Sequence, residues 1–315
     1  RFLKLAAVFL RYTIRVENKI EIEGLVFSHV KTRTYTPVSV YQSMDSFLRI
    51  GPKELISPEL ELHRKLLTYG FPVPQITSEG IKDGRQYYIE NSVGDTLLGT
   101  VFAEDSKKGE GVSREHFSDL VSLTSIFAEA QLKTLESREA FNEFYKGIHV
   151  DVLEEELPEL KDTIRLAVEK LQKGTASLPT VLSHGDLNPH NLFKKGVIDF
   201  GSSFHAPAGY DLITNLYHIY NFPADSSHEN ARRYDFTAEQ RAEYLSTMDK
   251  IYEKHHLPKV SDFLNHFIFA RAIWSAVKMD HYPKLQAWRY EQFKKILDTY
   301  ISGGDLAELV TRNKL

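Results

Sequence analysis

Residues 184–201 are decisive for the fold, and they read His184-Gly-Asp-Leu-Asn-Pro-His-Asn191, then Leu-Phe-Lys-Lys-Gly-Val, then Ile198-Asp-Phe-Gly201. They follow the apolar stretch Val181-Leu182, which predicts a short strand that runs into a polar turn. Beyond that turn, Leu192-Phe193 and Val197-Ile198 predict two very short strands. A three-residue turn would join them, with Gly196 in its left-handed position.

Asn191 and Asp199 flank this predicted hairpin symmetrically. The register would place them directly opposite each other, with β-carbons about 5 Å apart. An amide oxygen and a carboxylate at that separation can bind one Mg²⁺ ion, while phosphate oxygens and water complete its octahedron. The pair therefore predicts a Mg-ATP site.

Asp186 lies five residues before Asn191, in the polar turn. Its carboxylate could accept the proton of an attacking hydroxyl and orient that oxygen in line with the γ-phosphate of ATP. Asp186 is therefore the expected catalytic base. His184 is expected to be structural, packing the turn with a ring hydrogen bond, because phosphoryl transfer needs no second base.

The order His-Gly-Asp, four residues, Asn, then Ile-Asp-Phe-Gly resembles the aminoglycoside phosphotransferase and choline kinase-type family, within the protein-kinase-like fold. The resemblance implies that Asp186 is the catalytic aspartate and that Asn191 and Asp199 ligate the metal. Ala208-Gly-Tyr-Asp211-Leu is similar to a further family segment. It implies that Asp211 braces the catalytic loop.

The first part of the chain resembles the family more loosely. Ser46-Phe-Leu-Arg49-Ile-Gly is similar to the strand that carries the nucleotide-contacting lysine, with Arg49 in its place. Arginine keeps the charge but offers a planar fork. Its expected partner is Glu59, because leucines follow at i+3 and i+7 and hold it on the inward face of a helix. Glu61 remains the alternative.

Residues Tyr88 to Gly94 resemble the hinge, so the main chain of Glu90 and Ser92 is expected to contact adenine. The segment Lys31 to Pro37 stands where protein kinases carry a glycine-rich phosphate loop, and it contains no glycine. Thr34 and Thr36, or alternatively Arg33, could then contact the phosphates.

The wider pattern predicts an α+β fold of two lobes. β-branched and aromatic residues over 20–50 predict an antiparallel meander, and a helix is expected from Ser57-Pro58 to about Gly70. Beyond Gly94, long amphipathic stretches predict a mainly helical part. We expect a small nucleotide-binding lobe over residues 1–92 and a large helical lobe, with the catalytic loop and acceptor site, over residues 93–315.

Composition excludes several classes of function. Lysine and arginine (39) nearly balance aspartate and glutamate (43) without a basic stripe, so no nucleic-acid partner is expected. With no cysteine, the chain has no disulfide or thiolate site. This absence fits a cytoplasmic location, although it is also compatible with secretion. The apolar stretch Leu5 to Leu10 is too short for a membrane span. The oligomeric state stays open.

Two features of the helical part leave alternatives open. Histidines and aromatic residues such as His218 and Trp274 could form a ligand cage, but at helical spacing they more often form core. Arg271 lies in the very apolar stretch Phe267 to Trp274 and needs a buried partner. A structural ion pair and a substrate contact are equally open for it. His190, beside the metal ligands, receives no role.

These inferences predict an ATP-dependent kinase that phosphorylates a hydroxyl of a small molecule, with ATP and Mg²⁺ as cofactors. The alternative is a weak or inactive nucleotide-binding scaffold of the same fold. Retention of Asp186, Asn191 and Asp199 argues against a scaffold, because a chain freed from chemistry needs neither a base nor two metal ligands. A protein kinase has no support, since the Ala-Pro-Glu segment is missing.

Overall fold

The structure is a computed structural model that describes residues 17–33, 36–109, 111–136, 141–225, 227–277 and 281–312. The chain forms two compact units. Unit 1 comprises Arg1–Asp95 with Lys195–Ile198, and unit 2 comprises Thr96–Lys194 with Asp199–Leu315. The division after Asp95 lies three residues beyond the expected boundary at residue 92.

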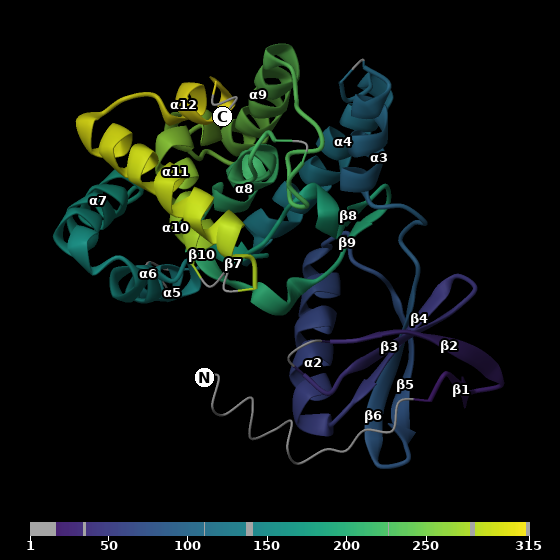
Figure 1. Cartoon of the computed structure of the whole chain (residues 1–315). Coiled ribbons are helices and arrows are strands. Elements are labelled where there is room, and N and C mark those ends of the chain that lie inside the picture. Colours follow the sequence, from purple (N-terminus) through teal and green to yellow (C-terminus); the bar gives the residue numbers. More distant parts are fainter. Residues whose placement is uncertain are drawn as a thin grey trace. The chain divides into compact units, whose positions relative to one another are not determined.

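Unit 1 is built on a six-stranded antiparallel sheet in the order β1-β2-β3-β4-β6-β5 (Figure 1). Its strands are β1 (Lys19–Ile22), β2 (Leu25–Thr32), β3 (Ser39–Ser43), β4 (Ser46–Gly51), β5 (Ile76–Lys82) and β6 (Arg85–Asn91). The first four form the expected meander. β4 pairs with β6 so that Arg49 lies opposite Tyr88.

One face of this sheet is covered by helix α2 (Lys53–Tyr69), whose buried residues include Ile56 and Leu60. The helix ends at Gly70 as expected, because Gly70 takes the left-handed conformation (φ 80°) that closes a helix. The expected start at Ser57 is wrong, since α2 begins four residues earlier and contains Pro58. Pro58 is thus the sixth residue of α2 and lies beyond the first turn, which is the part of a helix where proline is usually found.

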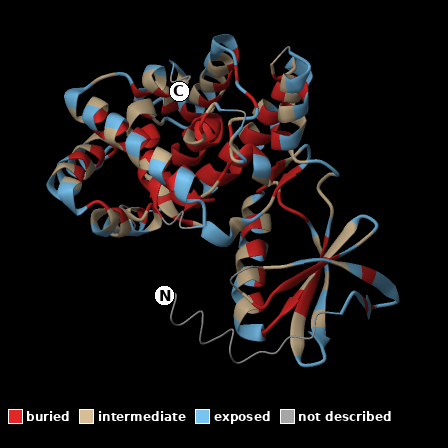
Figure 2. Ribbon diagram, viewed as in Figure 1, coloured by how far each residue is buried: buried red, intermediate tan, exposed pale blue. Residues whose placement is uncertain are grey.

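Unit 2 is mainly helical, and its core is deepest around α8 and α10 (Figure 2). Every residue of α8 is buried. The helices are α3 (Leu98–Lys107), α4 (Arg114–Gln131), α5 (Phe141–Gly147), α6 (Val150–Glu156), α7 (Lys161–Gly174), α8 (Tyr210–Tyr217), α9 (Ala238–Lys254), α10 (Leu264–Ala276), α11 (Pro283–Ser302) and α12 (Leu306–Arg312). Among these, no helix is both long and apolar enough to cross a lipid bilayer.

Two short antiparallel strands flank the loop of unit 2 in which the sequence predicts the catalytic residues. They are β7 (Thr180–Ser183), which is buried throughout, and β10 (Phe204–Pro207). Ser183 pairs with Phe204, so the residues just after β7 and just before β10 are held together. This pairing encloses residues 184–203.

The hairpin predicted inside this segment forms with a different turn. Strands β8 (Leu192–Phe193) and β9 (Gly196–Val197) are joined by two residues, Lys194 and Lys195, instead of three. Gly196 therefore lies in a strand and not at a left-handed turn position. A Cβ atom there would meet the Pro72 carbonyl oxygen at 2.9 Å and the Val93 side chain at 2.6 Å, so close packing accounts for this glycine.

Candidate active site

The catalytic loop begins with a glycine that tolerates no side chain. Gly185 has φ 79°, and a Cβ atom on it would lie 2.1 Å from the Ser202 carbonyl oxygen. That distance is well inside van der Waals contact. The His-Gly-Asp sequence therefore sets the direction of the chain just before Asp186.

Asp211, in the first turn of α8, is fully buried beneath this loop. Its Oδ1 accepts hydrogen bonds from the Ser183 hydroxyl (2.9 Å) and the Gly185 N–H (3.3 Å). Its Oδ2 accepts bonds from the His184 N–H (3.0 Å) and the Gln131 amide (2.6 Å). Burial raises the pKa of the Asp211 carboxyl, while His184 and the hydrogen bonds from Ser183 and Gln131 oppose the rise. These bonds tie Asp211 to the residues just before Asp186, and its role as a brace stays a prediction.

His184 is fully buried, and its ring packs against Phe200 with centroids 4.4 Å apart. Its Nδ1 accepts a hydrogen bond from the Asp186 N–H at 3.3 Å. Both contacts are within the loop and agree with the structural role expected for His184.

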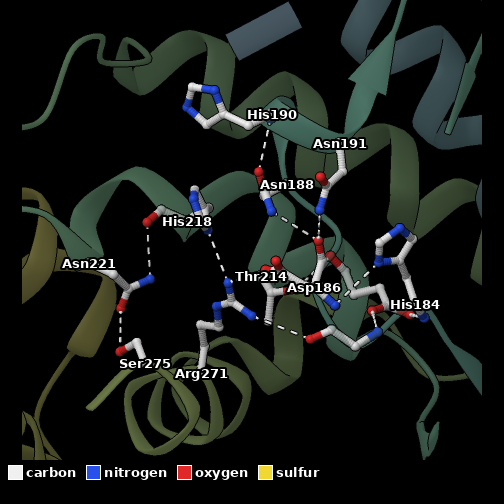
Figure 3. Close-up of polar contacts among 12 residues, drawn as sticks. His184, Asp186, Asn188, His190, Asn191, Thr214, His218, Asn221, Arg271 and Ser275 are labelled. Carbon is white, nitrogen blue, oxygen red and sulfur yellow. Dashed lines mark hydrogen bonds and ion pairs between the residues drawn. The ribbon is translucent and has the colours of Figure 1, made fainter. Parts of the chain in front are cut away.

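Asp186 is held at both its main chain and its side chain (Figure 3). Its carbonyl oxygen accepts bonds from the Asn188 and Asn191 amides, at 3.0 and 2.9 Å. Its carboxylate Oδ1 accepts a bond from Arg271 Nη2 at 2.6 Å. No described residue donates to Oδ2. The carboxylate is therefore oriented, with one oxygen left to receive a proton.

The oxygens of Asn191 and Asp199 suit a hard cation. Asn191 uses its amide nitrogen on Asp186, and its Oδ1 has no partner among the described residues. Asp199 has a positive φ of 67°, and its exposed carboxylate pairs with no described cation. No group of three or more His, Cys, Asp or Glu in the described chain is placed to hold a metal. Mg²⁺ would need phosphate and water besides these two ligands.

Arg271 resolves one of the alternatives left open by the sequence. It lies on α10, is 2 % exposed, and forms an ion pair with Asp186. Its Nη2 also donates to His218 Nδ1 at 3.1 Å, and its guanidinium lies 3.8 Å from the centre of the Trp274 ring. Figure 3 shows Arg271 between His218 and the catalytic loop. The cation that His218 and Trp274 contact is thus the Arg271 guanidinium.

Reasoning from the sequence missed the contributions of Gln131 and His218. Gln131 is a buried polar residue at the end of an apolar helix, and that was the available signal. Burial, followed by the charge of Arg271, holds the pKa of His218 well below its usual range. A neutral His218 can accept the bond from Arg271.

A second polar cluster lies wholly within unit 1. Arg49 donates to Glu90 at 2.9 Å and to Glu59 at 3.3 Å, so the pairing expected with Glu59 is present. Glu59 also receives two bonds from Arg33 (2.8 and 2.9 Å) and one from the Tyr88 hydroxyl at 2.7 Å. Burial opposes ionisation, but Arg49 and Arg33 outweigh it and lower the pKa of the Glu59 carboxyl.

The other residues expected to contact the nucleotide differ in whether their polar groups already have a partner. The Glu90 side chain is 3 % exposed and is committed to Arg49. The Ser92 N–H, which the hinge resemblance would offer to adenine, donates to the Asp45 carbonyl at 2.6 Å. Thr36 has a buried hydroxyl without a partner in the described chain, and its contact with phosphate stays a prediction. Thr34 lies outside the described residues.

Comparison with solved structures bears on the fold. A choline/ethanolamine kinase family protein from Mesorhizobium loti has a TM-score of 0.54 at 14% identity, with 95% of this chain and 94% of that chain covered. An aminoglycoside-3'-phosphotransferase of type VIII has a TM-score of 0.47 at 16% identity, with 84% and 98% covered. An aminoglycoside phosphotransferase from Streptomyces rimosus has 0.47 at 14%, with 79% and 92% covered.

Comparison of the sequence with family models gives a direct assignment. Residues 39–245 match the model of the phosphotransferase enzyme family, whereas no curated protein matches the sequence. The matched range contains Arg49, the whole catalytic loop and Asp211. The expected two-lobed α+β, protein-kinase-like fold is confirmed. The chain belongs to the phosphotransferase enzyme family.

Proposed function

We propose that this protein is an ATP-dependent kinase that transfers the γ-phosphoryl group to a hydroxyl of a small molecule. The observation that carries the proposal is the way in which the Asp186 carboxylate is held. Arg271 and two amide groups fix its position, while Oδ2 accepts no bond from the described residues. An oriented carboxylate with one open oxygen is what a general base for a hydroxyl requires.

In this reaction Asp186 Oδ2 accepts the proton of the acceptor hydroxyl, and that hydroxyl oxygen forms a bond to the γ-phosphorus. The bond between the γ-phosphorus and its bridging oxygen breaks, so ADP leaves and a phosphate ester and a proton result. Asn191 Oδ1 and the Asp199 carboxylate would hold Mg²⁺, which neutralises phosphate charge when bound. Arg271 keeps the base in place throughout.

In unit 1 we propose that Arg49 carries the positive charge for the nucleotide phosphates, held by Glu59. The orphan Thr36 hydroxyl supports a phosphate contact in the glycine-free segment. The ADP bound in a Streptomyces rimosus aminoglycoside phosphotransferase is consistent with nucleotide use. Because the Ser92 N–H is already paired, adenine recognition has to rely on other main-chain groups.

Thermal denaturation with and without Mg-ATP tests the nucleotide assignment. We expect millimolar Mg-ATP to raise the melting temperature of the wild type and Asp199→Ala to abolish the increase, since the ion would lose its charged ligand. Lack of stabilisation in the wild type would refute ATP binding. Stabilisation without ADP production from any acceptor would instead favour the non-catalytic scaffold.

A further inference from the structure

Two buried arginines from different helices act on the same carboxylate. Arg271 comes from α10 and Arg289 from α11, and they are 2 % and 7 % exposed. Arg271 pairs directly with Asp186. Arg289 hydrogen-bonds the carbonyl of Ser275, one turn after Arg271 on α10, so the two arginines meet on the same part of that helix. The three groups form one charged cluster, which includes the proposed base Asp186.

Arg289 has no carboxylate partner in the described chain. Its Nε donates to the Asn221 carbonyl at 3.0 Å and its Nη1 to the Ser275 carbonyl at 2.8 Å. Its Nη2 donates to no described residue, and it is not one of the unpaired polar atoms that the protein seals from solvent. One face of this guanidinium is therefore still available for a hydrogen bond.

The Arg271 guanidinium also has spare capacity. Its Nε is buried and has no hydrogen-bond partner within the described residues. The Gly185 carbonyl oxygen accepts from its Nη1 at 3.4 Å, and the ring Nδ1 of the neutral His218 accepts from its Nη2 at 3.1 Å. Neither acceptor carries a charge, so Asp186 is the only anion among the described residues that Arg271 contacts.

The cluster thus holds two positive charges and one negative charge. The carbonyl end of α10, near Ser275, supplies roughly half a negative charge at most. Burial, followed by the charge of Arg271, lowers the pKa of Arg289 to about 9, because no carboxylate pairs with it directly. A buried cation without an anionic partner is costly, so its persistence beside a reactive group points to a ligand that completes it.

We propose that the acceptor carries an anionic group, a carboxylate or a phosphate, which binds to Arg289 and Arg271 while a neighbouring hydroxyl reaches Asp186. This inference rests on the proposed phosphotransferase function. Arginine suits such a partner because its planar fork can donate two parallel hydrogen bonds to two oxygens. The same charges would repel a cationic acceptor.

Matched acceptors test this charge preference. Gluconate, glucitol and glucamine share one polyol skeleton and differ at one end, as do glycerate, glycerol and 3-amino-1,2-propanediol. Glycerol phosphate and glucitol phosphate supply the phosphate arm. With Mg-ATP, we expect ADP production to favour the anionic member of at least one set by tenfold or more in kcat/KM. Preference for the neutral or amine member would overturn the proposal.

Variants of Arg289 show whether the cluster causes the preference. We expect Arg289→Gln to raise KM for the preferred anion at least tenfold and to change kcat less than threefold. Arg289→Lys should retain part of the preference, which guards against a folding defect in Arg289→Gln. Arg241→Gln is the control, because Arg241 is a half-buried arginine that, unlike Arg289, pairs with a carboxylate, that of Asp235. Equal loss with all acceptors in Arg289→Gln would contradict the proposal.

A binding experiment separates this inference from the proposed function. If no acceptor is phosphorylated, inorganic phosphate and sulfate are titrated calorimetrically into the wild type and Arg289→Gln, with Mg-ATP titrated separately. Anion binding that disappears in Arg289→Gln supports the proposal even without turnover. Binding of Mg-ATP with no binding of either anion overturns the anionic acceptor and leaves the nucleotide assignment intact.

Discussion

The ionic cluster of unit 1 and that of unit 2 differ in their charge balance. In unit 1, Arg33 and Arg49 face Glu59 and Glu90, and direct ion pairs link the four residues. In unit 2, Arg271 pairs with Asp186, while Arg289 contacts only carbonyl oxygens of the described residues. The first cluster is neutral by itself, whereas the second has an unmatched positive charge.

The balanced cluster mainly supports the fold of unit 1, whereas the unbalanced cluster contains the proposed catalytic base. A balanced network satisfies its own hydrogen bonds and mainly holds two strands, a helix and a loop of unit 1 together. An unbalanced cluster is stabilised only when an additional anion binds to it. Substitutions in unit 1 should therefore change stability and, through Arg49, nucleotide binding, whereas substitutions in unit 2 should change turnover.

The largest effect should come from removing the negative charge of the unit 2 cluster. Asp186→Asn leaves the loop its shape but removes the proton acceptor, so we expect kcat to fall by about 10³-fold. Steady-state ADP production measures this change. Mg-ATP should still raise the melting temperature of the variant, and full activity in Asp186→Asn would exclude Asp186 as the base.

Removing the anion beneath the loop should reduce stability as well as activity. Asp211→Ala leaves four donors without an acceptor in a buried site, which should cost about 3 kcal/mol of unfolding free energy or more. Urea denaturation measures the change. Asp211→Asn is the matched control and should lose less, because an amide oxygen can still accept some of these bonds.

Glu59→Gln breaks the balance of unit 1 and should cost about 2 kcal/mol, since the charge that Arg33 and Arg49 share is lost. The pKa of the Glu59 carboxyl is lowered on folding, so its contribution to stability is present at neutral pH and is lost as the pH falls below about 4.5. Urea midpoints against pH should therefore fall less steeply in Glu59→Gln. Parallel curves would contradict this assignment.

The smallest effect is expected at an exposed ion pair. Lys294 and Glu291 lie 3.2 Å apart on α11, with side chains 40% and 65% exposed. Solvent screens such pairs, so Lys294→Ala should change the unfolding free energy by less than about 1 kcal/mol. A larger loss would show that a charge pair at short distance stabilises the protein even when exposed. Burial would then not explain the expected effects in the two clusters.

Local sequence predicted the parts of the molecule that depend on neighbours in the chain. The catalytic loop, the strand before it and the five longest helices of unit 2 follow from short motifs and helical periodicity. The short helices α5, α6 and α12 have seven residues each, too few to show a clear period. Helix α2 was predicted too short, because Pro58 was taken to mark its first turn.

Contacts between distant residues set the limits of prediction. The polar character of Arg271 inside an apolar helix showed that it needed a partner, but Asp186 is 85 positions away in the chain. Arg33 and Glu59 are similarly separated by 26 positions. The turn between β8 and β9 differed because the close packing of Gly196 against Val93, and not a left-handed turn, requires the glycine.

Phosphorus NMR of the wild type with ATP, Mg²⁺ and the matched acceptors tests the central claim most directly. The account predicts a new phosphomonoester signal that grows in equal amount with ADP, first in the mixtures with an anionic acceptor, and is absent with Asp186→Asn. Release of inorganic phosphate with ADP but no phosphomonoester, or an equal new signal with Asp186→Asn, would contradict it.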